Sequence, residues 1–167
     1  MRVITRVDAS SQIGSGHVMR CLQLADTLIE QGAECEFVCR EHDGHLMDHI
    51  LSRGYEVHAL TRPSKNVSFT SELAHASWLG VDWQTDAAQT RQSLGSEGLD
   101  WLIVDHYALD HRWESALRSS CKRIIAIDDL ADRQHDCDLL LDQNYGSSAE
   151  RYRGLVPANC KQCHGPK

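Results

Sequence analysis

Short runs of apolar and β-branched residues alternate along the chain with longer stretches in which apolar residues recur every three or four positions. Runs of the first kind are typical of strands, and stretches of the second kind are typical of amphipathic helices. The run at 100–104 is apolar on both faces, as a strand is when helices cover both sides of a parallel sheet. The pattern predicts strands over 2–8, 34–40, 55–60, 100–104, 122–127 and 138–141, helices over 18–31, 45–52, 71–79, 82–94 and 110–119, and a loop over 61–71.

This alternation predicts an α/β fold with a Rossmann-like, doubly wound parallel sheet. The chain has 167 residues, a length that fits one domain better than two, so we expect 1–167 to form a single Rossmann-like domain. Three prolines and the lack of any low-complexity run leave little room for a disordered linker. No repeat of fixed period is present.

Acidic residues follow several of the predicted strands. In an open parallel sheet, ligands bind outside the carboxyl ends of the strands, where the strand order reverses. Any one of these acids can instead be explained as the cap of the following helix. Several on one edge, close in sequence to three residues with polar rings, favour a shared site. The acids are Asp8, Asp105, Asp128 with Asp129, and Asp142, and the rings are His17, His106 and Tyr107.

The turn after the first strand has the sequence Gly14-Ser15-Gly16 and places His17 at the start of a helix. Its backbone N–H groups favour anions. Position 19 is methionine, where a dinucleotide fingerprint needs a third glycine, so the signal for nucleotide binding is weak. The helix dipole disfavours a protonated imidazole, so we expect a neutral His17 that can accept a proton. The alternative is a surface histidine without a role.

A second group, Asp105-His106-Tyr107, follows the most apolar strand. Asp105 could orient an imidazole or a sugar hydroxyl, and Tyr107 could donate a hydrogen bond from a ring that also stacks. The alternative is that Asp105 caps the helix near 110 and Tyr107 packs in the interior. The residues leave these two interpretations evenly balanced.

The segment Cys160-Lys161-Gln162-Cys163-His164 matches the pattern of c-type haem attachment. The chain shows no export signal and has only three residues after the motif, so we interpret the match as a coincidence. A zinc site would need a distant ligand such as Cys35 or Cys39, and the spacing does not support one. We therefore expect no cofactor and no metal. The seven cysteines are an odd number, as expected for thiols in a reducing compartment.

Charge and hydropathy exclude several classes of function. The formal net charge of -7 argues against nucleic acid as a partner, because phosphate-backbone binding needs a basic face. No stretch approaches the ~20 apolar residues of a membrane span, and the first residues do not form a signal peptide. We therefore expect a cytoplasmic protein without a membrane partner, in which the glycosylation sequon at Asn66 is not used.

Longer segments are more specific than these motifs. In chain order, RVDASSQIGSGHVMRCLQLADTL, LIVDHYALD, IDDLADRQHDCDLLLDQN and YRGLVPANC together resemble one family, the UDP-2,4-diacetamido-2,4,6-trideoxy-β-L-altropyranose hydrolases of pseudaminic acid biosynthesis. The resemblance extends over nearly the whole chain. It implies the N-terminal domain of a two-domain fold similar to that of GT-B glycosyltransferases.

The resemblance also implies an activity and a set of site residues. Such hydrolases release UDP from a UDP-activated amino sugar by placing water on the anomeric carbon with inversion. His17 would be the general base, and Tyr107 a second catalytic residue. The remaining candidates would contact the substrate: Arg6, Asp8, Gly14, Ser15, Gly16, Asp105, His106 and Asp128.

The family's chain continues past position 167 into a second domain that holds most of the contacts to UDP. The resemblance therefore implies that a C-terminal half is needed, in cis or in trans, and that 1–167 alone has little turnover. Two other functions stay open. A GT-B glycosyltransferase would use His17 on a sugar acceptor, and a protein without catalytic activity would bind a sugar or a partner. The D-H-Y and I-D-D segments favour the hydrolase.

Overall fold

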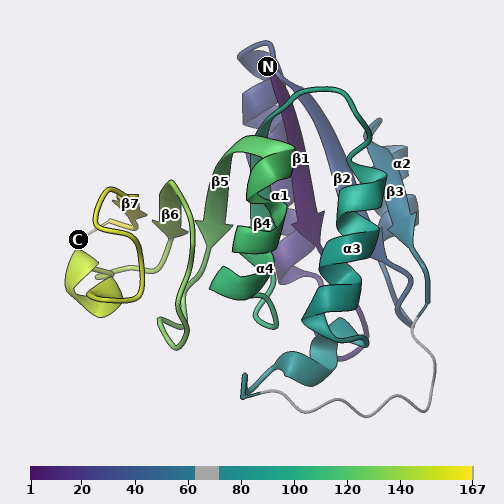
Figure 1. Ribbon diagram of the computed structural model, residues 1–167. Helices are drawn as coiled ribbons and strands as arrows, with labels where there is room; N and C mark the ends of the chain where they lie inside the picture. Colours follow the sequence, from purple (N-terminus) through teal and green to yellow (C-terminus); the bar gives the residue numbers. More distant parts are fainter. Residues whose placement is uncertain (63–71, 167) are drawn as a thin grey trace.

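The computed structural model describes residues 1–62 and 72–166. In this part of the chain, seven strands form one sheet, all parallel, in the order β3-β2-β1-β4-β5-β6-β7 (Figure 1). The strands are β1 (Arg2–Val7), β2 (Glu34–Arg40), β3 (Glu56–Leu60), β4 (Leu99–Asp105), β5 (Cys121–Ile127), β6 (Leu139–Asp142) and β7 (Lys161–His164). The predicted α/β fold with a parallel sheet is confirmed.

Helices cover both faces of this sheet (Figure 1). One face packs against α1 (Gly16–Glu30) and α2 (Met47–Ser52), and the other packs against α3 (Trp83–Ser93) and α4 (His111–Leu117). Short 3₁₀ helices form at η1 (Ala76–Leu79), η2 (Arg118–Ser120) and η3 (Ala149–Tyr152). The apolar residues of β4 alternate between the two cores, which explains why this strand is apolar on both faces.

Local sequence fixes several helix boundaries. The side chain of Asp82 accepts a hydrogen bond from the backbone of Thr85 at the start of α3, and Asp110 does the same for Arg112 at the start of α4. These are the N-caps that acidic residues commonly provide. After α1 the chain turns at Gly32, whose φ of 82° lies in the left-handed region that favours glycine.

The structure corrects the sequence prediction at two places. The helix predicted over 71–79 is only a 3₁₀ turn, η1, which ends at the left-handed Gly80; Ser71 lies outside the described residues, as does the sequon at Asn66. The strand β7 was not predicted, because its four residues are polar or half-buried and lack a strand pattern. β7 forms because its backbone pairs with β6, with Leu139 opposite Lys161.

Candidate functional site

The strand order reverses between β1 and β4, which are neighbours in the sheet. From β1 the chain moves outward through β2 to β3, and from β4 it moves in the other direction through β5 and β6 to β7. The carboxyl ends of β1 and β4 therefore define the topological switch point, where ligands bind in open α/β sheets. Asp8 follows β1, and Asp105 ends β4.

A small hollow lies at this switch point. Five of the residues predicted from the sequence line it, together with two that were not predicted. These are Asp8, His17, Asp105, His106 and Tyr107, with Ile13 and Trp78 in addition. Sites for drug-sized ligands usually measure roughly 300–1,000 Å³. Almost no free volume remains between the side chains of this hollow, so a whole nucleotide sugar does not fit inside it.

His17 is the second residue of α1 and is nearly buried. Its Nδ1 lies 2.6 Å from Oδ1 of Asp105, a residue 88 positions further along the chain. A carboxylate can only accept, so Nδ1 carries the proton and Nε2 is left as the acceptor nitrogen. Nε2 has no hydrogen-bond partner among the residues that the structure describes. His17 thus has the geometry of a base held in one tautomer by an acid.

Arg20 also binds Asp105, although the sequence analysis did not single it out. It lies three residues after His17, on the same face of α1, and donates from Nε to Oδ2 and from Nη2 to Oδ1 of Asp105, each at 2.5 Å. Burial alone would raise the pKa of Asp105, but the hydrogen bonds from Arg20 and His17 hold it below its ordinary value. Asp105 therefore stays ionised. Only the helical spacing from His17 could have indicated Arg20.

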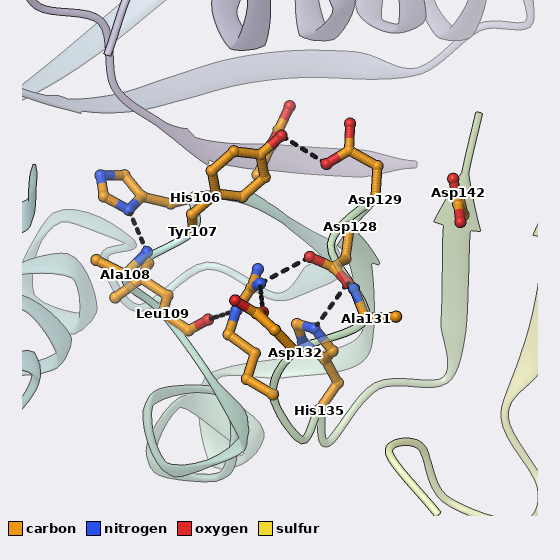
Figure 2. Close-up of polar contacts among 12 residues, drawn as sticks. His106, Tyr107, Ala108, Leu109, Asp128, Asp129, Ala131, Asp132, His135 and Asp142 are labelled. Atoms are coloured by element: carbon orange, nitrogen blue, oxygen red, sulfur yellow. Dashed lines mark hydrogen bonds and ion pairs between the residues drawn. The ribbon is translucent and has the colours of Figure 1, made fainter. Parts of the chain in front are cut away.

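Tyr107 stands beside the base. Its ring meets the imidazole of His17 edge-on, with centroids 4.6 Å apart. Its hydroxyl donates to Oδ1 of Asp129 at 2.5 Å (Figure 2). Burial and this carboxylate raise the pKa of Tyr107 above its ordinary value, so the hydroxyl keeps its proton. Tyr107 is therefore a fixed donor and a wall of the hollow.

Trp78 forms the opposite part of this wall and was missed by the sequence analysis. Its ring lies 5.8 Å from that of Tyr107, and the ring of His75 lies 4.5 Å from Trp78. Both residues come from the segment around η1, where the sequence predicted an ordinary helix. Nothing in the local pattern shows that this segment reaches the carboxyl ends of β1 and β4.

His106 and Asp8 form the buried floor. Nδ1 of His106 accepts the backbone N–H of Ala108 at 3.1 Å (Figure 2). Its Nε2 lies 3.2 Å from Oδ2 of Asp8 without the alignment of a hydrogen bond. Burial lowers the pKa of His106, which favours the neutral ring. Asp8 stays ionised because, against the effect of burial, the charge of Arg6 holds its pKa well below the ordinary value.

Arg6 does not reach the surface, and the contact with substrate that the resemblance implies stays a prediction. Its side chain is fully buried and donates two hydrogen bonds to Asp8, at 2.5 and 2.9 Å, and two to Asp86, at 3.2 and 2.7 Å. A guanidinium engaged in this way supports Asp8 from beneath. Asp86 on α3, 80 residues further along the chain, fixes the orientation of the Arg6 side chain.

The turn at 14–16 lies beside the hollow but does not line it. Gly14 has a φ of 81°, and its N–H donates to the carbonyl of Ser10 at 2.8 Å. Ser15 precedes α1 without capping it through its side chain. A Cβ added at Gly14 or Gly16 would meet no atom within 4 Å. This turn sets the position of His17 and leaves open space around it.

Asp128 and Asp142 do not join the shared site that four strand-end acids suggested. Asp128 is buried and binds Arg133 at 2.7 Å and the N–H of Ala131 at 2.9 Å, with His135 at 3.9 Å (Figure 2). These partners lower its pKa although burial opposes them. Asp142 lies on the next strand and accepts from Ser147 and Arg151. Both carboxylates thus bind residues in the segments that follow their strands.

Among the described residues, one group has the donor atoms for a metal ion, and it is remote from the hollow. Glu36, Glu56 and His58 lie on β2 and β3 with donor atoms within 4.8 Å of one another. Nε of Arg2 already lies 2.7 Å from Oε1 of Glu36, which places a positive charge where a cation would bind. In the part of the chain that the structure describes, no helix has the length and hydropathy needed to cross a membrane.

The parallel sheet, with its ionised acid, oriented imidazole and aromatic wall at the switch point, defines a Rossmann-like α/β domain with a candidate site for a small polar ligand. No protein-family model matches the chain. The chain is 32% identical over 162 residues to the UDP-2,4-diacetamido-2,4,6-trideoxy-β-L-altropyranose hydrolase of Campylobacter jejuni. The match covers 96% of this chain and 48% of that protein, so the chain spans about half the length of this curated relative. The resemblance indicated by the sequence motifs is confirmed.

Proposed function

We propose that this chain supplies the base of an enzyme that hydrolyses a UDP-linked 2,4-diacetamido-2,4,6-trideoxy sugar to UDP and the free sugar. The observation that carries the proposal is the 2.6 Å contact between Nδ1 of His17 and Asp105, which leaves Nε2 as the acceptor at the hollow. The name of the C. jejuni relative supports the class of reaction and substrate.

In the proposed reaction, Nε2 of His17 removes a proton from a water molecule as the water oxygen attacks the anomeric carbon. The bond between that carbon and the phosphate oxygen breaks, and its electron pair leaves with UDP. Asp105 stabilises the imidazolium that forms, and Arg20 keeps Asp105 ionised and in place. The proton then returns to solvent.

The other residues of the hollow orient the reacting group. Tyr107 and Trp78 provide an aromatic wall that limits where the sugar ring can lie and how much water enters. Asp8 and His106 provide a polar floor whose direction is fixed from beneath by Arg6. Since the hollow is too small for a nucleotide sugar, we propose that a second domain, in cis or in trans, binds most of the UDP.

The test is UDP release by the intact native polypeptide that carries this sequence, with water as the sole acceptor. We expect His17→Ala to lower turnover by roughly 10²–10⁴-fold, the usual contribution of a general base, and to leave the thermal unfolding midpoint almost unchanged. The matched control is His58→Ala on β3, remote from the hollow, which should keep full turnover. Equal turnover in His17→Ala would remove His17 from the mechanism.

A second measurement identifies the bond that breaks. In water labelled with oxygen-18, attack at the anomeric carbon leaves UDP unlabelled, whereas attack at phosphorus places the label in UDP. UDP release that requires an added sugar or lipid acceptor would identify a glycosyltransferase instead. Saturable sugar binding with no UDP release under any of these conditions would identify a binding protein.

A further inference from the structure

Two thiols face each other at the opposite edge of the sheet from the candidate site. Sγ of Cys137 lies 3.6 Å from Sγ of Cys160. Cys137 comes two residues before β6, and Cys160 comes directly before β7. No other pair of cysteines in the described residues is joined by a hydrogen bond. Cys160, the first cysteine of the Cys160-x-x-Cys163 motif, thus has Cys137 as its neighbour, which the spacing of the motif did not suggest.

The two thiols differ in accessibility and acidity. Cys137 is 1% exposed, whereas Cys160 is partly exposed. The hydrogen bond between the two thiols lowers the pKa of Cys160 and, together with burial, raises the pKa of Cys137. Oxidants react with the accessible thiolate first. Cys160 is thus the thiol that would react, and Cys137 the one placed to displace the product.

The pairing of β6 with β7 brings the two segments that carry these cysteines together. The N–H of Lys161 donates to the carbonyl of Asp138 at 2.9 Å, and β6 and β7 pair in parallel from Leu139 onward. The paired strands therefore place Cys160 beside the segment that carries Cys137. To form a bond, the two sulfur atoms must approach from 3.6 Å to about 2.0 Å.

The motif partner, Cys163, is unsuited to bond with Cys160 while β7 is formed. An extended chain rises about 3.3 Å per residue, so three residues span roughly 10 Å. A disulfide needs Cα atoms within about 7 Å of each other. Cys163 is also exposed on β7 and points away from the core that Cys137 joins.

We propose that Cys137 and Cys160 form a dithiol site that a peroxide oxidises to a disulfide. The Cys160 thiolate attacks one peroxide oxygen and the O–O bond breaks, which gives a sulfenic acid on Cys160 and a hydroxide ion. The hydroxide takes up the proton that the Cys160 thiol lost on ionisation and becomes one water. The Cys137 sulfur then attacks the Cys160 sulfur and displaces the oxygen as a second water. The two thiols lose two electrons, and one hydrogen peroxide becomes two waters.

The disulfide would close a loop that contains β6 and η3. This loop includes Arg151. Its Nη2 donates to the backbone carbonyl of Asp129 at 3.0 Å, and the carboxylate of the same residue accepts a hydrogen bond from the Tyr107 hydroxyl. Cross-linking a loop of this length stabilises the fold by restricting the unfolded chain. For this chain length we expect oxidation to raise the thermal unfolding midpoint by roughly 5–10 °C.

The test is treatment of the full protein with hydrogen peroxide, followed by alkylation of remaining thiols and peptide mapping without reductant. We expect one cross-linked peptide pair, joined through Cys137 and Cys160, with a mass lower by two hydrogen atoms. Cys163→Ser, the matched control, should give the same cross-link and the same shift in unfolding midpoint. Cys160→Ser should abolish both, and Cys137→Ser should leave a sulfenic acid on Cys160 that dimedone traps.

Other results would overturn the proposal. A bond between Cys160 and Cys163, a cross-link between two chains, or retention of both thiols after peroxide would each exclude this dithiol site. Protection of the two thiols from alkylation by stoichiometric Zn²⁺ alone would identify a metal site instead. The peptide map of the unsubstituted protein decides among these results even if a cysteine variant fails to fold.

Discussion

Two clusters of charged side chains meet at the same edge of the sheet, and they differ in exposure. The sealed cluster consists of Arg6, Asp8, Arg40 and Asp86, whose side chains are all 0% exposed. The open cluster consists of His17, Arg20, Asp105, Asp129 and Tyr107. Its central acid, Asp105, is equally buried, but the side chains of His17 and Arg20 are 10% and 15% exposed.

The comparison separates charges that hold the fold from charges that can react. In the sealed cluster two guanidinium groups balance two carboxylates, and each charge has a partner within 2.7 Å. Removing one partner would leave an unpaired charge away from water. In the open cluster, Nε2 of His17 has no partner among the described residues. A proton can therefore be exchanged there without breaking an ion pair.

The largest expected effect is on the sealed cluster. Asp86→Ala removes the acceptor of Arg6, Arg40 and the indole N–H of Trp113. We expect the free energy of unfolding to fall by about 3–5 kcal/mol, because buried Arg40 loses its counter-charge and Arg6 keeps only Asp8. Urea denaturation measures this loss. The control is Asp43→Ala, whose partner Arg62 is exposed and whose loss should cost less than about 1 kcal/mol. Similar losses in the two variants would contradict the distinction between the clusters.

A pH titration sharpens the comparison through a third buried pair, His135 and Glu114, in which Nδ1 and Oε1 lie 2.7 Å apart. Burial lowers the pKa of His135, but the charges of Glu114 and Asp128 outweigh burial and raise the pKa to about 9. A pKa that is higher in the folded state stabilises the fold fully below the unfolded value of about 6.5. This contribution is lost as the pH rises from about 6.5 through 9.

The free energy of unfolding should therefore fall by on the order of 2–3 kcal/mol between pH 6.5 and pH 9.5. In His135→Gln this part of the pH dependence should disappear, and the protein should be less stable than the unsubstituted chain at pH 6. Chemical denaturation at a series of pH values tests both statements. An unchanged slope in His135→Gln would assign the pH dependence to another group.

The smallest expected effect is in the open cluster. Tyr107→Phe keeps the aromatic wall but removes the hydrogen bond to Asp129, which still has Arg20 at 3.4 Å. One such bond contributes about 1 kcal/mol, so we expect turnover to fall by no more than about tenfold. Comparison of kcat with that of His17→Ala is the measurement. A thousand-fold loss would mean that the Tyr107 hydroxyl acts on the reacting atoms, as the sequence resemblance implied.

Several site residues were predictable because their positions follow from local pattern. His17 follows a glycine turn at a helix start, and Asp105 and Tyr107 follow a strand that is apolar on both faces. Their convergence in one hollow is what the rule for parallel sheets predicts, and the structure shows it. Their catalytic roles stay predictions, as does the second domain.

The rest depends on contacts between distant segments. Arg6 alternates along β1 like any strand residue, and only the position of Asp86, 80 residues later, turns it into a buried counter-ion. Trp78 reaches the hollow from a segment whose own sequence indicates an ordinary helix. Asp142 ends a strand as Asp105 does, and Asp128 directly follows one, yet loops close over both.

The amino-acid sequence by itself determined the α/β class, the two-sided burial of the central strands and the edge on which the site lies, because periodicity records which side chains leave water. Only the tertiary structure decided which acid orients His17, which arginine holds that acid, and which polar groups are sealed. The physical reason is that strand order and side-chain direction are set by packing between elements far apart in the chain, and a local pattern carries no record of those partners.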